Sequence, residues 1–189
     1  MDHQDDVKIA DLSDPAFHPQ PREAEERESL LDDVITQKKN GNLKKARQLG
    51  AMLAAEVADN DGEFVFGIDH VETGDMICQR RLLLAFTISY GLDLYCPGKL
   101  TPQTATNQFY ETIQQSAPHI YEDMQQEAAF SLYYLCVRDE EEVVAAVGRT
   151  FAALCGYKDD KVYCELGSAL FEHFLRLVHD KAKSLQFAG

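Results

Sequence analysis

Three residues with metal-ligating side chains, His119, Glu122 and Asp123, are spaced three and four positions apart. On a helix this spacing places one imidazole and two carboxylates on the same face, where they could ligate a metal ion. A di-iron carboxylate bundle requires Glu-x-x-His on two helices and two further glutamates, and this sequence contains no Glu-x-x-His. We therefore interpret the three residues as the solvated start of a helix, and we expect no metal and no cofactor.

Arg80 and Arg81 are adjacent basic residues in a segment whose apolar spacing predicts a central helix over residues 75–90. Arg81 shares a helical row with Leu84 and Ile88, so its guanidinium must reach solvent, a carboxylate or a bound anion. An internal ion pair or a surface position is the simpler interpretation. If the protein binds an anionic ligand, we expect Arg81 and its neighbour Arg80 to contact it.

His173 lies between Leu170 and Leu177 on an otherwise apolar helical stripe. A histidine in this setting could act as a pH switch or as an acid or base, although a hydrogen-bonded histidine at the core boundary is the commoner arrangement. We take Arg80, Arg81 and His173 as the candidate ligand or partner contacts.

Four tyrosines, Tyr90, Tyr110, Tyr133 and Tyr134, could line a ligand pocket, since aromatic walls with polar tips suit small molecules. Core tyrosines whose hydroxyls reach the surface explain the same residues. The sequence has no glycine-rich dinucleotide motif, no P-loop and no serine or cysteine in a known nucleophile motif. Catalysis is therefore the third choice, after protein binding and small-molecule binding.

The composition and the net charge of the chain restrict the kinds of partner that it can bind. The chain has 189 residues with 45% hydrophobic and 26% charged, which predicts a folded domain with a core. Its net charge of -14 repels phosphate backbones, so nucleic-acid binding is disfavoured and a basic partner surface is favoured.

The cysteines and the N-terminal residues predict a cytoplasmic protein. The acidic start of the chain has no apolar signal-peptide region, and no apolar run approaches the roughly 20 residues that span a bilayer. The cysteines are odd in number, form no metal-binding spacing and lie mostly among apolar residues, which is typical of reduced core thiols. They are Cys78, Cys96, Cys136, Cys155 and Cys164.

Apolar residues at intervals of three and four predict an all-α fold of about seven helices, packed as a compact antiparallel bundle or array. We expect residues 1–20 to form a flexible acidic arm and residues 21–189 to form a single all-helical domain, with its first helix from Pro21 to Lys39. The run Gly41 to Ala46, GNLKKA, resembles the turn and second-helix start of a tetratricopeptide-repeat unit. The resemblance covers one unit, whereas a solenoid needs about three, so it implies a helical hairpin.

The run Ala128 to Val137, AAFSLYYLCV, is nearly continuous in apolar side chains, and we expect it to be the buried end of one central helix that starts near Ser116. The last helix carries a broad inward stripe from Val162 to Val178, which suggests self-association through this helix. We therefore expect a regulatory domain that binds a protein partner or a copy of itself without catalysis. The alternative is a helical domain that binds a small molecule, such as an anion.

Overall fold

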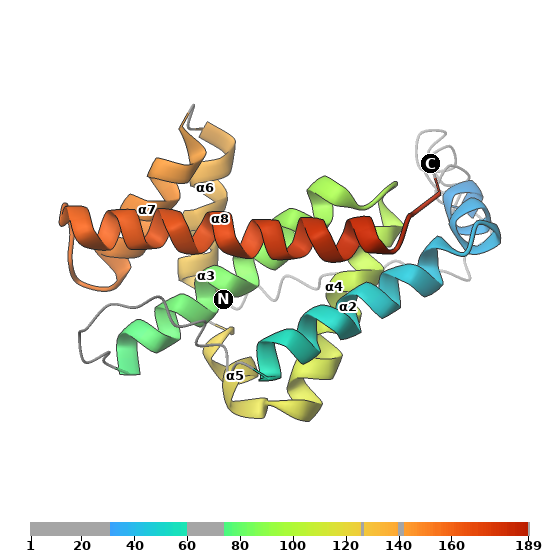
Figure 1. The fold of residues 1–189 in the computed structure, drawn as a ribbon, viewed down its shortest axis with the longest axis horizontal. Helices are drawn as coiled ribbons and strands as arrows, with labels where there is room; N and C mark the ends of the chain where they lie inside the picture. The colour runs from blue at the N-terminus through green and yellow to red at the C-terminus, as the bar shows by residue number, and fades with distance from the viewer. Residues whose placement is uncertain (1–30, 60–73, 126, 140–141, 189) are drawn as a thin grey trace, which may run out of the picture.

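The computed structural model describes residues 31–59, 74–125, 127–139 and 142–188, and every regular element in these ranges is a helix (Figure 1). The all-α prediction is confirmed. The predicted arm at residues 1–20, the helix start at Pro21 and most of the connection before α3 lie outside the described residues. Residues 31–39 are helical, and seven further helices follow: α2 (Asn42–Asp59), α3 (Gly74–Tyr95), α4 (Leu100–Ser116), α5 (Pro118–Asp123), α6 (Glu127–Asp139), α7 (Val143–Leu154) and α8 (Lys161–Ser184).

Helix α3 lies at the centre of the described fold. Every residue from Arg81 to Ile88 is buried, because α3 contacts α4, α5, α6, α7 and α8. Figure 1 shows α8 running across α3. The prediction of a central helix over residues 75–90 is therefore confirmed.

The expectation that Ala128 to Val137 is buried on all sides is wrong. Leu132, Tyr134 and Leu135 on α6 are 44%, 45% and 46% exposed. Within the described ranges, helix α6 packs mainly on α3 and α7, through a face that includes the buried residues Tyr133 and Cys136. Phe130 and Val137 are partly buried against the core, whereas Leu132, Tyr134 and Leu135 face outward.

The helix predicted to run from near Ser116 to Asp139 is two helices. Helix α5 ends at Asp123, and the Gln125 N–H donates to the carbonyl of Glu122, an i to i−3 bond that tightens the last turn. Helix α6 begins at Glu127. The apolar spacing is the same on both sides of this break, so periodicity could not reveal it.

Helices α7 and α8 cross at very close range because glycines lie at the contact. A Cβ atom placed on Gly148 would clash with the Ser168 hydroxyl and the Cys164 carbonyl, and one on Gly167 would lie 2.7 Å from Phe151 Cβ. The sequence predicts Asp159 or Asp160 as the N-cap of the last helix, and Asp160 is the cap, since its Oδ1 accepts a hydrogen bond of 2.9 Å from the Val162 N–H.

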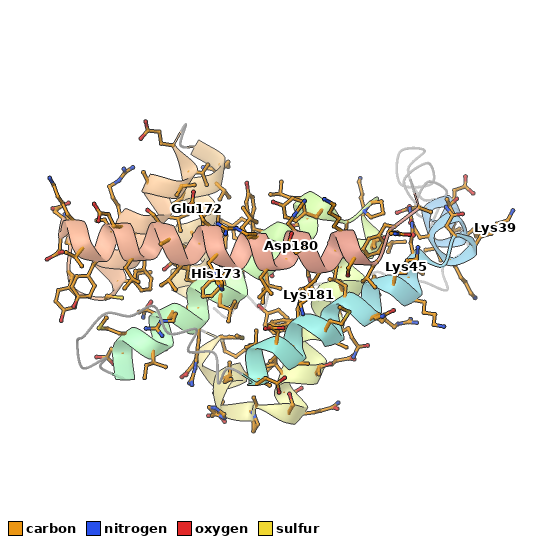
Figure 2. The ribbon with its side chains drawn as sticks, viewed as in Figure 1. Lys39, Lys45, Glu172, His173, Asp180 and Lys181 are labelled. Atoms are coloured by element: carbon orange, nitrogen blue, oxygen red, sulfur yellow. The ribbon has the colours of Figure 1, made fainter. Side chains whose placement is uncertain are left out.

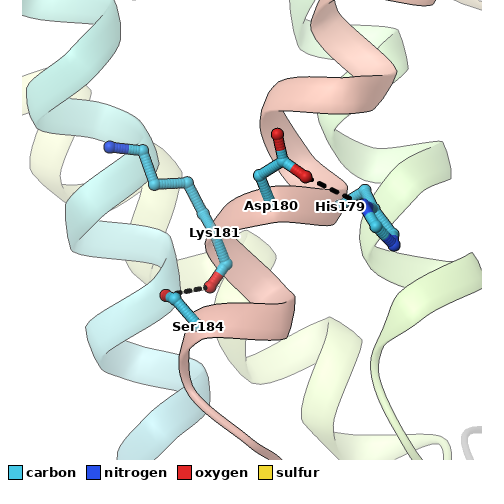
Figure 3. Close-up of polar contacts among 4 residues, drawn as sticks. All are labelled: His179, Asp180, Lys181 and Ser184. Atoms are coloured by element: carbon cyan, nitrogen blue, oxygen red, sulfur yellow. Dashed lines mark hydrogen bonds and ion pairs between the residues drawn. The ribbon is translucent and has the colours of Figure 1, made fainter.

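The C-terminal half of α8 is attached to α2 and α3. Lys181, seen in Figure 2 between α8 and α2, lies with Nζ 2.9 Å from Glu56 Oε2. The His179 ring meets Tyr95 edge to face at 5.1 Å, and its Nδ1 lies 3.0 Å from Asp180 Oδ1 (Figure 3). These contacts fix the helix on both sides.

The segment after α8 is held by the start of α2. The amide of Asn42 donates to the Ala188 carbonyl and to Gln37 Oε1, at 2.8 Å and 2.7 Å, and its oxygen accepts from the Ala188 N–H at 3.0 Å. Lys45 Nζ donates to the Gln186 carbonyl at 2.6 Å. The sequence predicts Asn42 as a helix cap, but its side chain pairs with the backbone of a residue 146 positions away.

The sequence predicts an apolar stripe of Leu30, Leu31, Val34 and Ile35 on the first helix, but Leu31 and Ile35 are each 61% exposed. The five cysteines are free thiols, and Cys96 and Cys136 are buried. Within the described ranges, no helix has the length and apolar character needed to cross a membrane.

Candidate functional site

A groove of about 560 Å³, which we call the tyrosine groove, lies where α4, α5 and α6 meet. Aromatic rings and a thioether supply most of its lining, and one amide and one hydroxyl supply polar groups in addition to the phenols. The lining residues are Tyr110, Tyr121, Met124, Gln125, Phe130, Ser131 and Tyr134. The groove is open to solvent, because Tyr134 is 45% exposed.

The break between α5 and α6 creates this groove. On one straight helix, Tyr121 and Tyr134 would be separated by about 20 Å along the axis. The turn at Met124 and Gln125 instead brings Tyr121 of α5 and Tyr134 of α6 to the same groove. Tyr110 of α4 completes it, with its ring centroid 6.3 Å from that of Tyr121 at an interplanar angle of 78°.

The α6 residues of the groove pack on Phe86, a fully buried residue of the central helix α3. The Phe86 ring contacts Phe130 and Tyr134 edge to face, at centroid distances of 5.6 Å and 5.4 Å. Phe130 and Tyr134 also contact each other at 5.8 Å. A rigid core residue therefore fixes the orientation of both rings.

The phenols of Tyr110 and Tyr134 are held in their neutral form. Burial raises the pKa of Tyr110 above its ordinary value, with smaller contributions from the neighbouring phenols of Tyr134 and Tyr121. Burial and then the negative charge of Asp93 raise the pKa of Tyr134. None of the seven lining residues carries a charge at neutral pH.

The outer face of α6 adjoins the groove. We use this name for Leu132, Tyr134 and Leu135, which are the exposed large apolar side chains of α6 among the described residues. Tyr134 belongs to both surfaces, since it also lines the groove. Together the groove and the outer face form one aromatic and aliphatic surface.

The two arginines predicted as ligand contacts are buried in the N-terminal half of α3, with Arg80 2% and Arg81 7% exposed. Arg81 meets a carboxylate, because its Nη1 lies 2.5 Å from Asp123 Oδ2. Neither arginine is among the groove-lining residues. Their role as ligand contacts therefore stays a prediction.

The Arg81 contact also bears on the predicted helix face of His119, Glu122 and Asp123. Asp123 pairs with Arg81, whereas His119 and Glu122 are exposed. Among the described residues, no group of three or more histidine, cysteine or acidic side chains is placed to hold a metal ion.

His173 is half-buried on α8, and Figure 2 shows it at the edge of α8 that borders α3. Desolvation lowers its pKa below the ordinary value of 6.5, and the positive charge of Arg176 lowers it further. His173 does not line the tyrosine groove. The structure therefore does not bring the three predicted contact residues together at this groove.

Of the four predicted pocket tyrosines, Tyr110 and Tyr134 line the groove. Tyr133 is fully buried, and the Tyr90 ring stacks on Phe86 at 5.9 Å. The sequence prediction omitted Tyr121 and Phe130. Their residue type was the available signal, but the predicted continuous helix would have separated them.

No protein-family model matches the chain, and no curated protein or solved structure matches it.

Proposed function

We propose that this protein is a non-catalytic binding protein that uses the tyrosine groove and the outer face of α6 to recognise a basic segment of a partner protein. The observation that carries this proposal is the half-exposure of Leu132, Tyr134 and Leu135 on one helix, next to an aromatic groove. Exposed apolar surface that is continuous with a groove is typical of interaction sites.

The residue types support a protein interface. Tyrosine is enriched in interface cores because it buries a large area with few rotatable bonds, and leucine adds apolar contact. Each square ångström of apolar surface removed from water contributes about 25 cal/mol. Covering the outer face of α6 is therefore favourable for a partner with an apolar side.

Charge supports a basic partner. The chain carries a net charge of -14, and the negative charge of Asp93, which is not a lining residue, acts on Tyr134 of the groove. A positively charged segment would be attracted to this surface and would bind faster at low ionic strength. A cytoplasmic location belongs to the same proposal and is supported by the free thiols, two of which are buried in the core.

The last helix offers less support for the predicted self-association. Leu166, Leu170, Phe174 and Val178 of its inward stripe are buried by other parts of the same chain, whereas Val162 is 56% exposed. We therefore assign the interface to α6 instead of α8.

A photocrosslinking amino acid at position 135 tests the proposal, and the same amino acid at Glu165, an exposed site on α8, is the matched control. We expect a partner to be crosslinked from position 135 only. That partner must then bind the purified protein, and Leu132→Glu with Leu135→Glu must weaken binding at least tenfold. A partner that binds the double variant normally contradicts the proposal, and a product of two copies of this chain assigns the surface to self-association.

A second candidate, small-molecule binding, is favoured by the volume of the groove. About 560 Å³ lies within the range of ligand pockets, roughly 300 to 1,000 Å³. An anionic ligand is not favoured there, because none of the lining residues is basic. Saturable binding of a small ligand in the groove that leaves partner capture unchanged would support this candidate.

A further inference from the structure

We infer that the tyrosine groove binds a methylated ammonium group, with aromatic rings on several sides of the cation. This inference rests on the proposed function in that it takes the groove as the recognition surface, and it names the chemical group recognised. It is carried by the convergence of three tyrosines, Phe130 and Met124 on one groove of about 560 Å³.

The groove presents rings from separate elements. Tyr110 and Tyr121 come from α4 and α5 and stand nearly perpendicular to each other, at 78°. Phe130 and Tyr134 come from α6 and are inclined at 46°. A cation among these rings can approach more than one aromatic surface within about 6 Å, the range over which the ring quadrupole attracts positive charge.

The electrostatics favour a cation over an anion or a neutral group. No lining residue is ionised at neutral pH by residue type, and burial and then the negative charge of Asp93 raise the pKa of Tyr134. The positive charge of Arg81 is offset by Asp123. A neutral apolar ligand would gain the apolar contact but would gain nothing from the ring quadrupoles or from Asp93.

Methylation of the ammonium group matters because of hydration. An unmodified lysine ammonium is compact and strongly hydrated, and it requires hydrogen-bond acceptors when it leaves water. Aromatic faces and the Met124 thioether, which supply most of the lining, are weak acceptors, and the amide of Gln125 and the hydroxyl groups are the ordinary acceptors there. Methyl groups remove the N–H donors and spread the charge over an apolar surface, which suits this lining.

The first experiment compares choline with 3,3-dimethylbutan-1-ol, which has the same shape but no charge, by NMR titration of the protein's tyrosine ring signals. We expect choline to bind about tenfold more tightly, as a cation–π contribution in a partly desolvated site predicts. Equal affinity for the two compounds, or no saturable binding of choline, would overturn the inference.

Variants locate the site. Tyr134→Leu removes an aromatic face and should weaken choline binding about tenfold, whereas Tyr134→Phe keeps the face and should retain most of the affinity. Tyr157→Leu is the matched control, because Tyr157 is an exposed tyrosine outside the groove, stacked on Tyr163 at 3.7 Å. Circular dichroism establishes that each variant is folded. Equal weakening by Tyr157→Leu would contradict the assignment.

Two peptides distinguish the source of the ammonium group and separate this inference from the proposed function. They have the same arginine-flanked sequence, one with trimethyllysine and one with unmodified lysine. Tighter binding of the methylated peptide than of choline supports a methylated protein segment. If choline binds more tightly than both, the groove serves a small molecule and the protein-partner proposal fails. If neither peptide nor choline binds but a captured partner depends on Leu132 and Leu135, the proposed function stands and this inference fails.

Discussion

Arg81 of α3 and Asp123 at the end of α5 form an ion pair in which Nη1 lies 2.5 Å from Oδ2. The arginine side chain is 9% exposed and the aspartate side chain 32% exposed, so the pair is partly screened by solvent. Asp123 is the last residue of α5, immediately before the turn that contains Met124 and Gln125. The pair therefore attaches the α5 wall of the tyrosine groove to the central helix.

Removal of this carboxylate should destabilise the protein and loosen the groove. We expect Asp123→Ala to lower the free energy of unfolding by about 2 kcal/mol, because it leaves a buried guanidinium without its carboxylate, while partial exposure limits the loss. Urea denaturation measures the change. Glu122→Ala, at the exposed neighbouring position, is the control and should stay within about 0.5 kcal/mol. Equal effects of the two variants would show that the pair contributes little.

The close crossing of α7 and α8 predicts that Gly148→Ala lowers the free energy of unfolding, although helix propensity alone predicts that it raises it. Alanine stabilises a helix interior relative to glycine by about 1 kcal/mol. Gly148→Ala should nevertheless destabilise the protein by about 2 kcal/mol, because its Cβ has no room beside Ser168 and the Cys164 carbonyl. Thermal or urea unfolding gives the sign, and Ala153→Ser, on the exposed face of α7, is the control. A stabilising Gly148→Ala would refute the tight crossing.

Asn42 should control the exposure of the segment after α8. Asn42→Ala removes the acceptor for the Ala188 N–H and the donor to the Ala188 carbonyl. We expect faster hydrogen exchange at Ala188 and a loss of about 1 to 2 kcal/mol in unfolding free energy. Gln48→Ala, on the exposed side of α2, should leave exchange at Ala188 unchanged. Unchanged exchange in Asn42→Ala would mean that other contacts hold this segment.

His173 should make stability depend on pH. Its folded-state pKa is lowered by burial and then by Arg176, so the unfolded chain binds the proton more tightly than the folded chain. The contribution is complete above the ordinary pKa of 6.5 and is lost as the pH falls from there to the lowered value. His173→Gln should reduce the fall in unfolding free energy between about pH 7 and pH 5. An unchanged slope would contradict the assignment, and His119→Gln, at an exposed site, is the control.

The sequence by itself determined the helical class and several helix ends. Apolar spacing predicted α3 as a central helix, since a run from Leu82 to Ile88 with few polar side chains can only be stable when it is covered on several sides. The cap of α8 was predicted as Asp159 or Asp160, because capping is a local interaction between a side chain and nearby backbone N–H groups, and Asp160 is the cap.

The tertiary structure decided which apolar faces are covered and where the groove lies. The apolar composition of α6 predicted a buried helix, yet Leu132 and Leu135 face outward because α6 packs mainly on α3 and α7 in the described fold. The break after Asp123 lies inside an uninterrupted helical pattern. A single continuous helix would have placed Tyr121 and Tyr134 far apart, so the sequence did not indicate that they share a groove. The partner of Asn42, residue 188, could not be predicted because nothing local links positions separated by 146 residues. Periodicity reports which residues share a helix face, whereas packing between helices decides which of those faces remains exposed.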